Sequence, residues 1–143
     1  MTDRIATTTW TGALPSGSGT VTLESSKAAQ FAVSWPARAE APDGLTSPEE
    51  LIAAAHSSCY SMQLSAILTQ AGTPPERIET NAKVSFGQRG EGFAITGILL
   101  TVRASVPGIE LTDFNAAAEQ AKQICPVSAA LTGTEITLDA ALI

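Results

Sequence analysis

A long stretch without any charged side chain, residues 51–71, constrains the fold of this chain more than any other feature. Ser47, Pro48 and Glu50 precede it in the order typical of a helix start: an N-cap serine, a proline at the first helical position and a glutamate three residues after the cap. Gly72 follows as a C-terminal stop. We therefore expect the whole stretch to form one helix.

This helix has no charged face to turn toward water. His56, Gln63 and Gln70 are polar enough to argue against a membrane span, so protein must cover the helix on most sides. The rest of the chain offers one modest sheet and one other helix, which is too little cover. We therefore predict that the helix packs near the two-fold interface of a homodimer. A charged share of 15%, against roughly 25% in typical soluble domains, agrees with a buried partner surface.

The remaining segments are predicted as strands and one further helix. Alternating apolar and polar residues indicate three early strands, 5–10, 20–24 and 31–35, and Pro36 ends the third. A hairpin, a second helix and a last strand follow at 78–86, 93–106, 112–124 and 135–142, with a bend expected at Gly97. This order predicts an α+β fold in a single domain of residues 1–143: an antiparallel β-sheet with a long buried central helix and a second helix.

Charge and composition exclude several classes of partner. The net charge is −6, and the eight Lys and Arg residues are scattered, so nucleic acid is not expected as a partner. The first ten residues lack the apolar run of a secretory signal, so we expect a cytoplasmic protein. One His and two Cys fall short of a usual structural zinc set, and neither a metal nor another cofactor is expected.

The two cysteines, Cys59 and Cys125, stand 66 positions apart. A reducing compartment argues against a permanent structural disulfide, so two interpretations stay open: burial as small apolar residues, or transient catalytic pairing. Cys59 lies in the middle of the predicted helix on one face with Met62. Cys125 directly precedes Pro126, which must break the second helix.

Two motifs carry a resemblance to a known family. The runs Ser47-Pro-Glu-Glu-Leu-Ile-Ala-Ala-Ala-His-Ser-Ser-Cys59 and Lys122-Gln-Ile-Cys-Pro-Val-Ser128 resemble the two cysteine motifs of the OsmC/Ohr family. The resemblance extends over essentially the whole chain. The Cys-Pro-Val-Ser form, and Arg38 at the end of the third predicted strand, resemble the OsmC branch. In the Ohr branch the catalytic arginine comes from the first hairpin loop, and residues 11–19 contain no Arg.

The resemblance implies an intertwined homodimer that reduces organic hydroperoxides to alcohols. It implies that Cys59 is the peroxidatic thiol, oxidised to a sulfenic acid, and that Cys125 is the resolving thiol that condenses with it into a disulfide. Arg38 is then the activating cation and Glu49 its carboxylate partner. A dithiol, for which a lipoylated protein is a candidate, restores the reduced pair.

Helix geometry adds a condition for Glu49. Ten residues of helix amount to about 15 Å of rise, so Glu49 and Cys59 of one chain cannot share a contact. Glu49 must act from the partner chain, or Arg38 must bridge the gap. The alternative is that Glu49 is simply a first-turn carboxylate favoured by the helix dipole.

Two other functions stay open from the residues alone. One is a non-enzymatic domain of the same fold that binds an apolar ligand or partner. The other is a hydrolase that uses Cys59 with His56, one turn earlier, as its base, although a satisfied buried histidine is the commoner case. Five large side chains are expected in the core or around an apolar pocket that would favour a bulky organic peroxide: Trp35, Tyr60, Met62, Phe86 and Phe93.

Overall fold

The computed structural model describes all of residues 1–143. Its contacts group the chain into two compact units, Met1–Leu51 and Ile52–Ile143. The expectation that residues 1–143 form a single domain stays a prediction.

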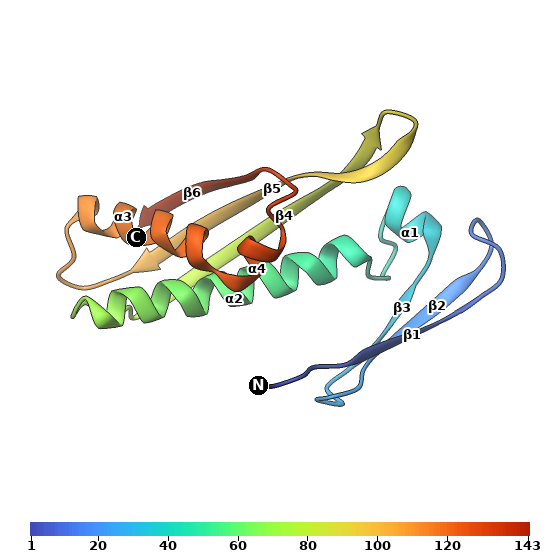
Figure 1. Cartoon of the computed structure of the whole chain (residues 1–143), viewed down its shortest axis with the longest axis horizontal. Helices are drawn as coiled ribbons and strands as arrows, with labels where there is room; N and C mark the ends of the chain where they lie inside the picture. The colour runs from blue at the N-terminus through green and yellow to red at the C-terminus, as the bar shows by residue number, and fades with distance from the viewer. The chain divides into compact units, whose positions relative to one another are not determined.

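The first unit holds a three-stranded antiparallel sheet in the order β1 (Ala6–Thr11), β2 (Ser18–Leu23) and β3 (Gln30–Val33), drawn in blue in Figure 1. Gly19 of β2 leaves room for the ring of Trp10 to pack against the β2 backbone, because a Cβ at Gly19 would lie 2.9 Å from that ring. All six residues of β1 are exposed.

The third strand ends earlier than predicted. After Val33, the hydroxyl of Ser34 accepts a hydrogen bond from the Ala37 N–H at 3.2 Å and caps a short helix, α1 (Trp35–Ala39). Pro36 stands in the first turn of this helix, where its missing N–H costs nothing. Arg38 therefore lies on a helix, and its expected place at the end of a strand is wrong.

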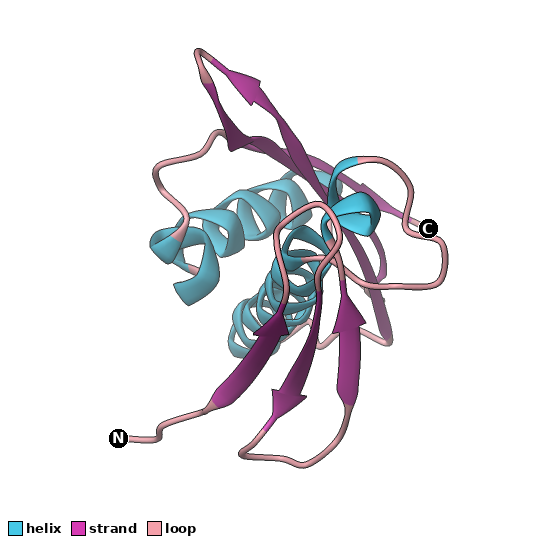
Figure 2. Ribbon diagram, turned by 90° about the vertical axis from the view of Figure 1, so that its right-hand side faces the viewer, coloured by secondary structure: helices cyan, strands magenta, loops and turns pink.

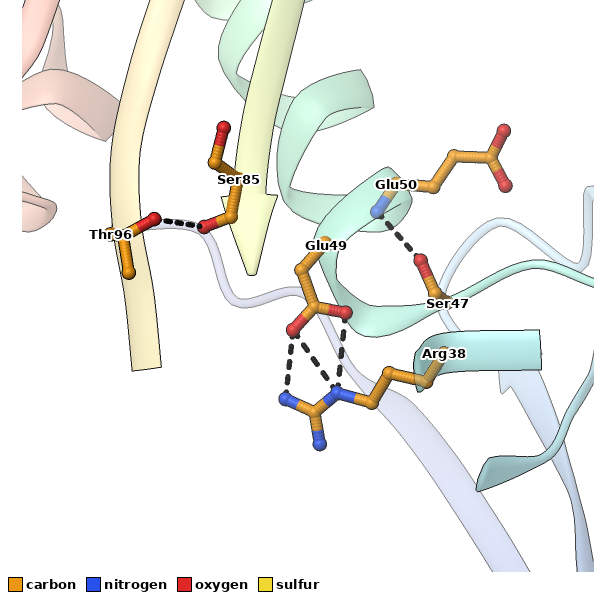
Figure 3. A network of polar contacts seen from close by, with 6 residues as sticks. All are labelled: Arg38, Ser47, Glu49, Glu50, Ser85 and Thr96. Atoms are coloured by element: carbon orange, nitrogen blue, oxygen red, sulfur yellow. Dashed lines mark hydrogen bonds and ion pairs between the residues drawn. The ribbon is translucent and has the colours of Figure 1, made fainter. Parts of the chain in front are cut away.

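The long charge-free stretch forms α2 (Pro48–Gln70), as predicted. The Glu50 N–H donates to the hydroxyl of Ser47 at 3.2 Å, which is the expected N-cap bond (Figure 3). The Glu50 carboxylate accepts a hydrogen bond from the Thr46 hydroxyl. Gly72 adopts a φ of +84°, the left-handed conformation that ends a helix readily only at glycine.

The second unit holds a sheet in the order β4 (Arg77–Arg89), β5 (Gly92–Ser105) and β6 (Ile136–Leu142). The hairpin of β4 and β5 is antiparallel, but β6 runs parallel to β5, so the expectation of a wholly antiparallel sheet is wrong here. The chain between β5 and β6 forms α3 (Leu111–Ile124) and α4 (Pro126–Ala130), and such a helical crossover returns the chain in the parallel direction.

The expected bend in β5 coincides with an irregularity in the hairpin. Ser85 pairs with Gly97, and the next residue of β4, Phe86, pairs with Ile95, so Thr96 is the extra residue of a bulge. The Thr96 hydroxyl donates to the Ser85 carbonyl oxygen at 3.4 Å (Figure 3).

The core of the second unit lies between one face of this sheet and the helices α2 and α3, which Figures 1 and 2 show on the same side of the strands. Alternate residues of β5 point into it: Ile98, Leu100, Val102 and Ala104. Tyr60 and Leu64 of α2 and Phe114 of α3 are fully buried against them. The core thus holds the middle of α2 against α3.

Some large side chains lie elsewhere than expected. Tyr60 is buried as predicted, but the side chain of Met62 is 68% exposed and that of Phe93 is 61% exposed. Phe93 stacks on Phe86 across the hairpin, with ring centroids 5.4 Å apart. The exposed Met62 stands on the same helix as Cys59.

Candidate active site

The two cysteines meet in the core of the second unit. The sulfur of Cys59 lies 3.0 Å from that of Cys125, and both are free thiols. Cys59 is half-buried in the middle of α2, whereas Cys125 is fully buried. Cys125 is also the residue at which α3 ends and α4 begins, because Pro126 has no N–H with which to continue α3. The predicted helix break thus aims Cys125 at Cys59.

The contact between the sulfurs changes the ionisation of both. Burial raises the pKa of the Cys59 thiol, and its hydrogen bond to Cys125 adds to this increase. Burial also opposes ionisation of Cys125, but hydrogen bonds from Cys59 and from the N–H and hydroxyl of Ser128 outweigh it and lower the Cys125 pKa. A single negative charge on the pair is therefore favoured on Cys125, with the Cys59 thiol as its donor.

His56 makes a contact that the sequence did not indicate. Its side chain is fully buried one turn before Cys59, and Nε2 lies 2.7 Å from the hydroxyl oxygen of Ser128. Nδ1 has no hydrogen-bond partner. The ring nitrogens therefore do not bond Cys59, and the Cys59–His56 pair required by the hydrolase alternative is not formed. Burial lowers the His56 pKa, so the imidazole is neutral.

Ser128 is the residue of this group that sequence reasoning missed. It stands at the end of the Cys-Pro-Val-Ser motif, three residues after Cys125, and is 4% exposed. The only signal that could have found it is this spacing, because three residues along a helical turn bring a side chain back over the first residue.

Arg38 and Glu49 form an ion pair within the first unit. Nη2 of Arg38 lies 2.8 Å from Oε1 of Glu49, and Nε lies 3.1 and 3.2 Å from Oε1 and Oε2 (Figure 3). Glu49 is buried in the first turn of α2. The guanidinium fork and the carboxylate thus fix one another's orientation.

A hollow of about 390 Å³ lies beside Arg38 in the same unit. Apolar side chains dominate its wall, with Trp10 of β1, Leu14 of the following loop and Trp35 of α1. Arg38 supplies the charged group of this wall. A cation at the edge of an apolar hollow suits a ligand with an apolar body and a polar end.

The four predicted site residues thus form two pairs, one in each unit. The structure brings Cys59 to Cys125 and Arg38 to Glu49. No group of three or more His, Cys, Asp or Glu side chains gathers anywhere in the chain as a metal site. None of the helices has the length and hydropathy that a membrane crossing requires.

A sulfur pair in contact, with hydrogen-bond donors around one of its members, defines a protein of the dithiol redox class. Comparison with known proteins identifies its family. The family model described as OsmC-like protein matches residues 41–140, and this chain belongs to that family. The expected resemblance is thereby confirmed.

Relatives of known sequence and structure agree. Peroxiredoxin OsmC of Escherichia coli (strain K12) is 45% identical over 130 residues, which cover 91% of this chain and 90% of that protein. An organic hydroperoxide resistance protein from Elizabethkingia anophelis superposes with a TM-score of 0.74 at 27% identity, covering 99% of each chain. An OsmC-like protein of Vibrio cholerae has the same fold, with a TM-score of 0.78 at 20% identity, over 99% of this chain and all of that one. The α+β OsmC-like fold is thus confirmed.

Proposed function

We propose that this protein is a cysteine-based peroxidase that reduces organic hydroperoxides to alcohols. The observation that carries this proposal is the 3.0 Å contact between the free thiols of Cys59 and Cys125. Cys59, the more accessible of the two, attacks the peroxide and becomes a sulfenic acid, and Cys125 condenses with it to a disulfide and water. The 45% identity to a peroxiredoxin over nine tenths of both chains supports this chemistry.

In this proposal Arg38 and Glu49 act on the peroxide, and their main effect is not to increase the ionised fraction of Cys59. Burial raises the pKa of Cys59, and even a thiol with the ordinary pKa of about 8.5 is only roughly 3% ionised at neutral pH. A cation that lowered the pKa would supply more thiolate but would also weaken the nucleophile. These two effects nearly cancel, so the larger gain comes from a donor placed where charge develops on the departing alkoxide. The buried Glu49 holds the Arg38 fork in one orientation for this task.

A second copy of the chain completes the site in this proposal. Glu49 and Cys59 stand about 15 Å apart along one helix, so an Arg38–Glu49 pair that acts on Cys59 can come from the partner. The surface of α2 supports a homodimer, since it exposes a run of uncharged residues: Ala54, Ala55, Ser58, Met62 and Ala66. The fully exposed strand β1 also lacks the cover that an intertwined partner would give.

The hollow beside Arg38 favours an organic substrate over hydrogen peroxide. Trp10, Leu14 and Trp35 offer apolar surface to an alkyl or aryl group, while Arg38 faces the peroxide end. Hydrogen peroxide has no apolar group to bury there, so it gains nothing from this wall.

A dithiol reductant closes the proposed cycle by reducing the Cys59–Cys125 disulfide. A lipoylated protein is the candidate, because its two thiols can exchange with the disulfide in sequence. Such a cycle needs a reducing compartment, and we place the protein in the cytoplasm.

The proposal is tested with the reduced full-length chain and one equivalent of cumene hydroperoxide. Two thiols per chain should disappear, and mass spectrometry should find a Cys59–Cys125 disulfide. Cys59→Ser should consume no peroxide, whereas Cys125→Ser should turn over once and stop at the sulfenic acid. Unchanged thiols after exposure to the peroxide, or full activity of Cys59→Ser, would instead favour a non-enzymatic domain that binds an apolar ligand.

A further inference from the structure

A short hydrogen-bonded chain of polar groups crosses the core beside the dithiol. Nε2 of His56 contacts the Ser128 hydroxyl at 2.7 Å, and Ser128 lies on α4, the short helix whose N-cap is Cys125. The Ser128 hydroxyl helps to lower the pKa of the Cys125 thiol. His56, Ser128 and Cys125 are all buried. His56 comes from α2, Ser128 from α4, and Cys125 from the junction of α3 and α4, so these hydrogen-bonding groups link α2 to that junction.

The hydroxyl of Ser128 fixes the direction of these hydrogen bonds. It has one hydrogen. When it donates that hydrogen to the Cys125 sulfur, it can act only as an acceptor toward His56, so Nε2 of His56 must be the donor. The imidazole is neutral, so the hydrogen that it donates is on Nε2 and none is left on Nδ1. Nδ1 is then a bare acceptor, which agrees with its lack of a partner.

Packing alone does not account for His56 at this position. An apolar side chain would fill the same space without a buried nitrogen that lacks a hydrogen bond, which has a cost in stability. The polar ring contributes one interaction that an apolar residue cannot, the hydrogen bond to the Ser128 hydroxyl at 2.7 Å.

We propose that His56 and Ser128 are positioning residues that prepare Cys125 for the resolving step, with His56 acting through the Ser128 hydroxyl on the Cys125 sulfur. This inference rests on the peroxidase function proposed above. In that step the Cys125 sulfur attacks the sulfur of the Cys59 sulfenic acid. The S–S bond forms, the S–O bond breaks, and the hydroxide leaves as water with the proton that Cys125 releases.

The oxidising equivalents come from the hydroperoxide, which has already converted Cys59 into the sulfenic acid, so no further oxidant is needed. As the proton leaves Cys125, negative charge develops on its sulfur, and the Ser128 hydroxyl donates to that charge. The other titratable side chains around Cys125 are Cys59, His56 and Tyr60, with Glu119 near Tyr60.

The test separates oxidation of Cys59 from its resolution. Reduced protein receives one equivalent of tert-butyl hydroperoxide without reductant, and samples quenched with dimedone at successive times are analysed by mass spectrometry. In Ser128→Ala and His56→Met the Cys59 sulfenic acid should persist roughly tenfold or more longer than in the natural protein, as expected for loss of a hydrogen bond to a charged group. The pH profile of disulfide formation should move to higher pH.

Two further variants distinguish this role from simple packing. His56→Gln, which carries an N–H close to the position of Nε2, should restore most of the resolving rate. Ser61→Ala is the matched control, because it removes a part-buried hydroxyl of the same helix that bonds Thr80 instead. It should leave the rate unchanged.

The inference is overturned if Ser128→Ala or His56→Met forms the disulfide at the natural rate with the natural pH profile. If His56→Met does not fold, Ser128→Ala against Ser128→Thr decides, since only threonine keeps the hydroxyl. Failure of the unaltered protein to form either sulfenic acid or disulfide is a different outcome, which rejects the peroxidase itself.

Discussion

Glu49 binds Arg38 through both Nε and Nη2 of the guanidinium, at 2.8 to 3.2 Å. The side chain of Glu49 is 8% exposed, whereas a third of the Arg38 side chain, 34%, remains exposed. The Glu49 carboxylate is thus the buried member of the pair, and the Arg38 side chain is the more accessible one. This asymmetry suits a cation that is held in place by protein and presented to a ligand.

The pair predicts a specific loss in Arg38→Lys. The second-order rate constant for tert-butyl hydroperoxide should fall by roughly 10² to 10³, because a lysine cannot hold Glu49 and meet the peroxide oxygen with one planar fork. Stopped-flow measurement of Cys59 oxidation gives this constant. Alkylation of Cys59 by iodoacetamide should change little, since the role proposed for Arg38 is to stabilise the leaving alkoxide.

A control is needed because removing either partner leaves the other unpaired. Arg38→Ala leaves the buried Glu49 carboxylate without its cation, so the variant could lose activity because it is unstable rather than because a catalytic group is missing. The double variant Arg38→Ala with Glu49→Gln removes both charges and should be slow yet folded. A double variant that oxidises Cys59 at the natural rate would show that the arginine has no catalytic part.

Local chemistry made the long helix α2 predictable. The start of α2 at Pro48 and its end before Gly72 follow from capping residues that act within one turn. The direction of β6 could not be predicted, because alternation along 136–142 is the same for parallel and antiparallel pairing. Pro36 was ambiguous for a similar reason, since proline suits both a strand end and the first turn of a helix.

The site was predictable only where a motif carried it. Cys59 and Cys125 stood out through the resemblance of their motifs, and the structure adds their contact. The bond between His56 and Ser128 joins residues 72 positions apart, and no local pattern specifies such a pairing. Met62 shares a helix face with Cys59, yet it is exposed, because the periodicity of one helix does not specify which part of the face another element covers.

Tyr60 gives a prediction about stability. Its hydroxyl donates to the carbonyl oxygen of Ala118 at 2.9 Å in the core, which ties α2 to α3. Tyr60→Phe keeps the ring and removes this bond, so the free energy of unfolding should fall by about 1 kcal/mol. Urea denaturation followed by circular dichroism measures the change. An unchanged midpoint would mean that the bond makes no net contribution.

The exposed uncharged run on α2 predicts the effect of a charge on assembly. Met62→Lys should convert the proposed dimer into monomers, because burying an unpaired ammonium group in an interface is costly. Sedimentation velocity reports the change. Leu99→Lys is the matched control, since Leu99 is a partly exposed leucine on the face of β5 away from the helices. Dimers that survive Met62→Lys but not Leu99→Lys would place the interface on the sheet instead.

His56 predicts how stability varies with pH. Burial lowers its pKa in the folded chain, whereas the unfolded chain has an ordinary histidine pKa of about 6.5. Below that pH the unfolded state binds a proton that the folded state does not, so stability is full above about pH 6.5 and falls with further acidification. The slope from this one group approaches 1.4 kcal/mol per pH unit, roughly the value of one bound proton.

Because the chain has a single histidine, His56→Gln should remove this contribution, and the difference between the two urea-denaturation series should widen as the pH decreases. Parallel series would mean that His56 can be protonated without unfolding the core.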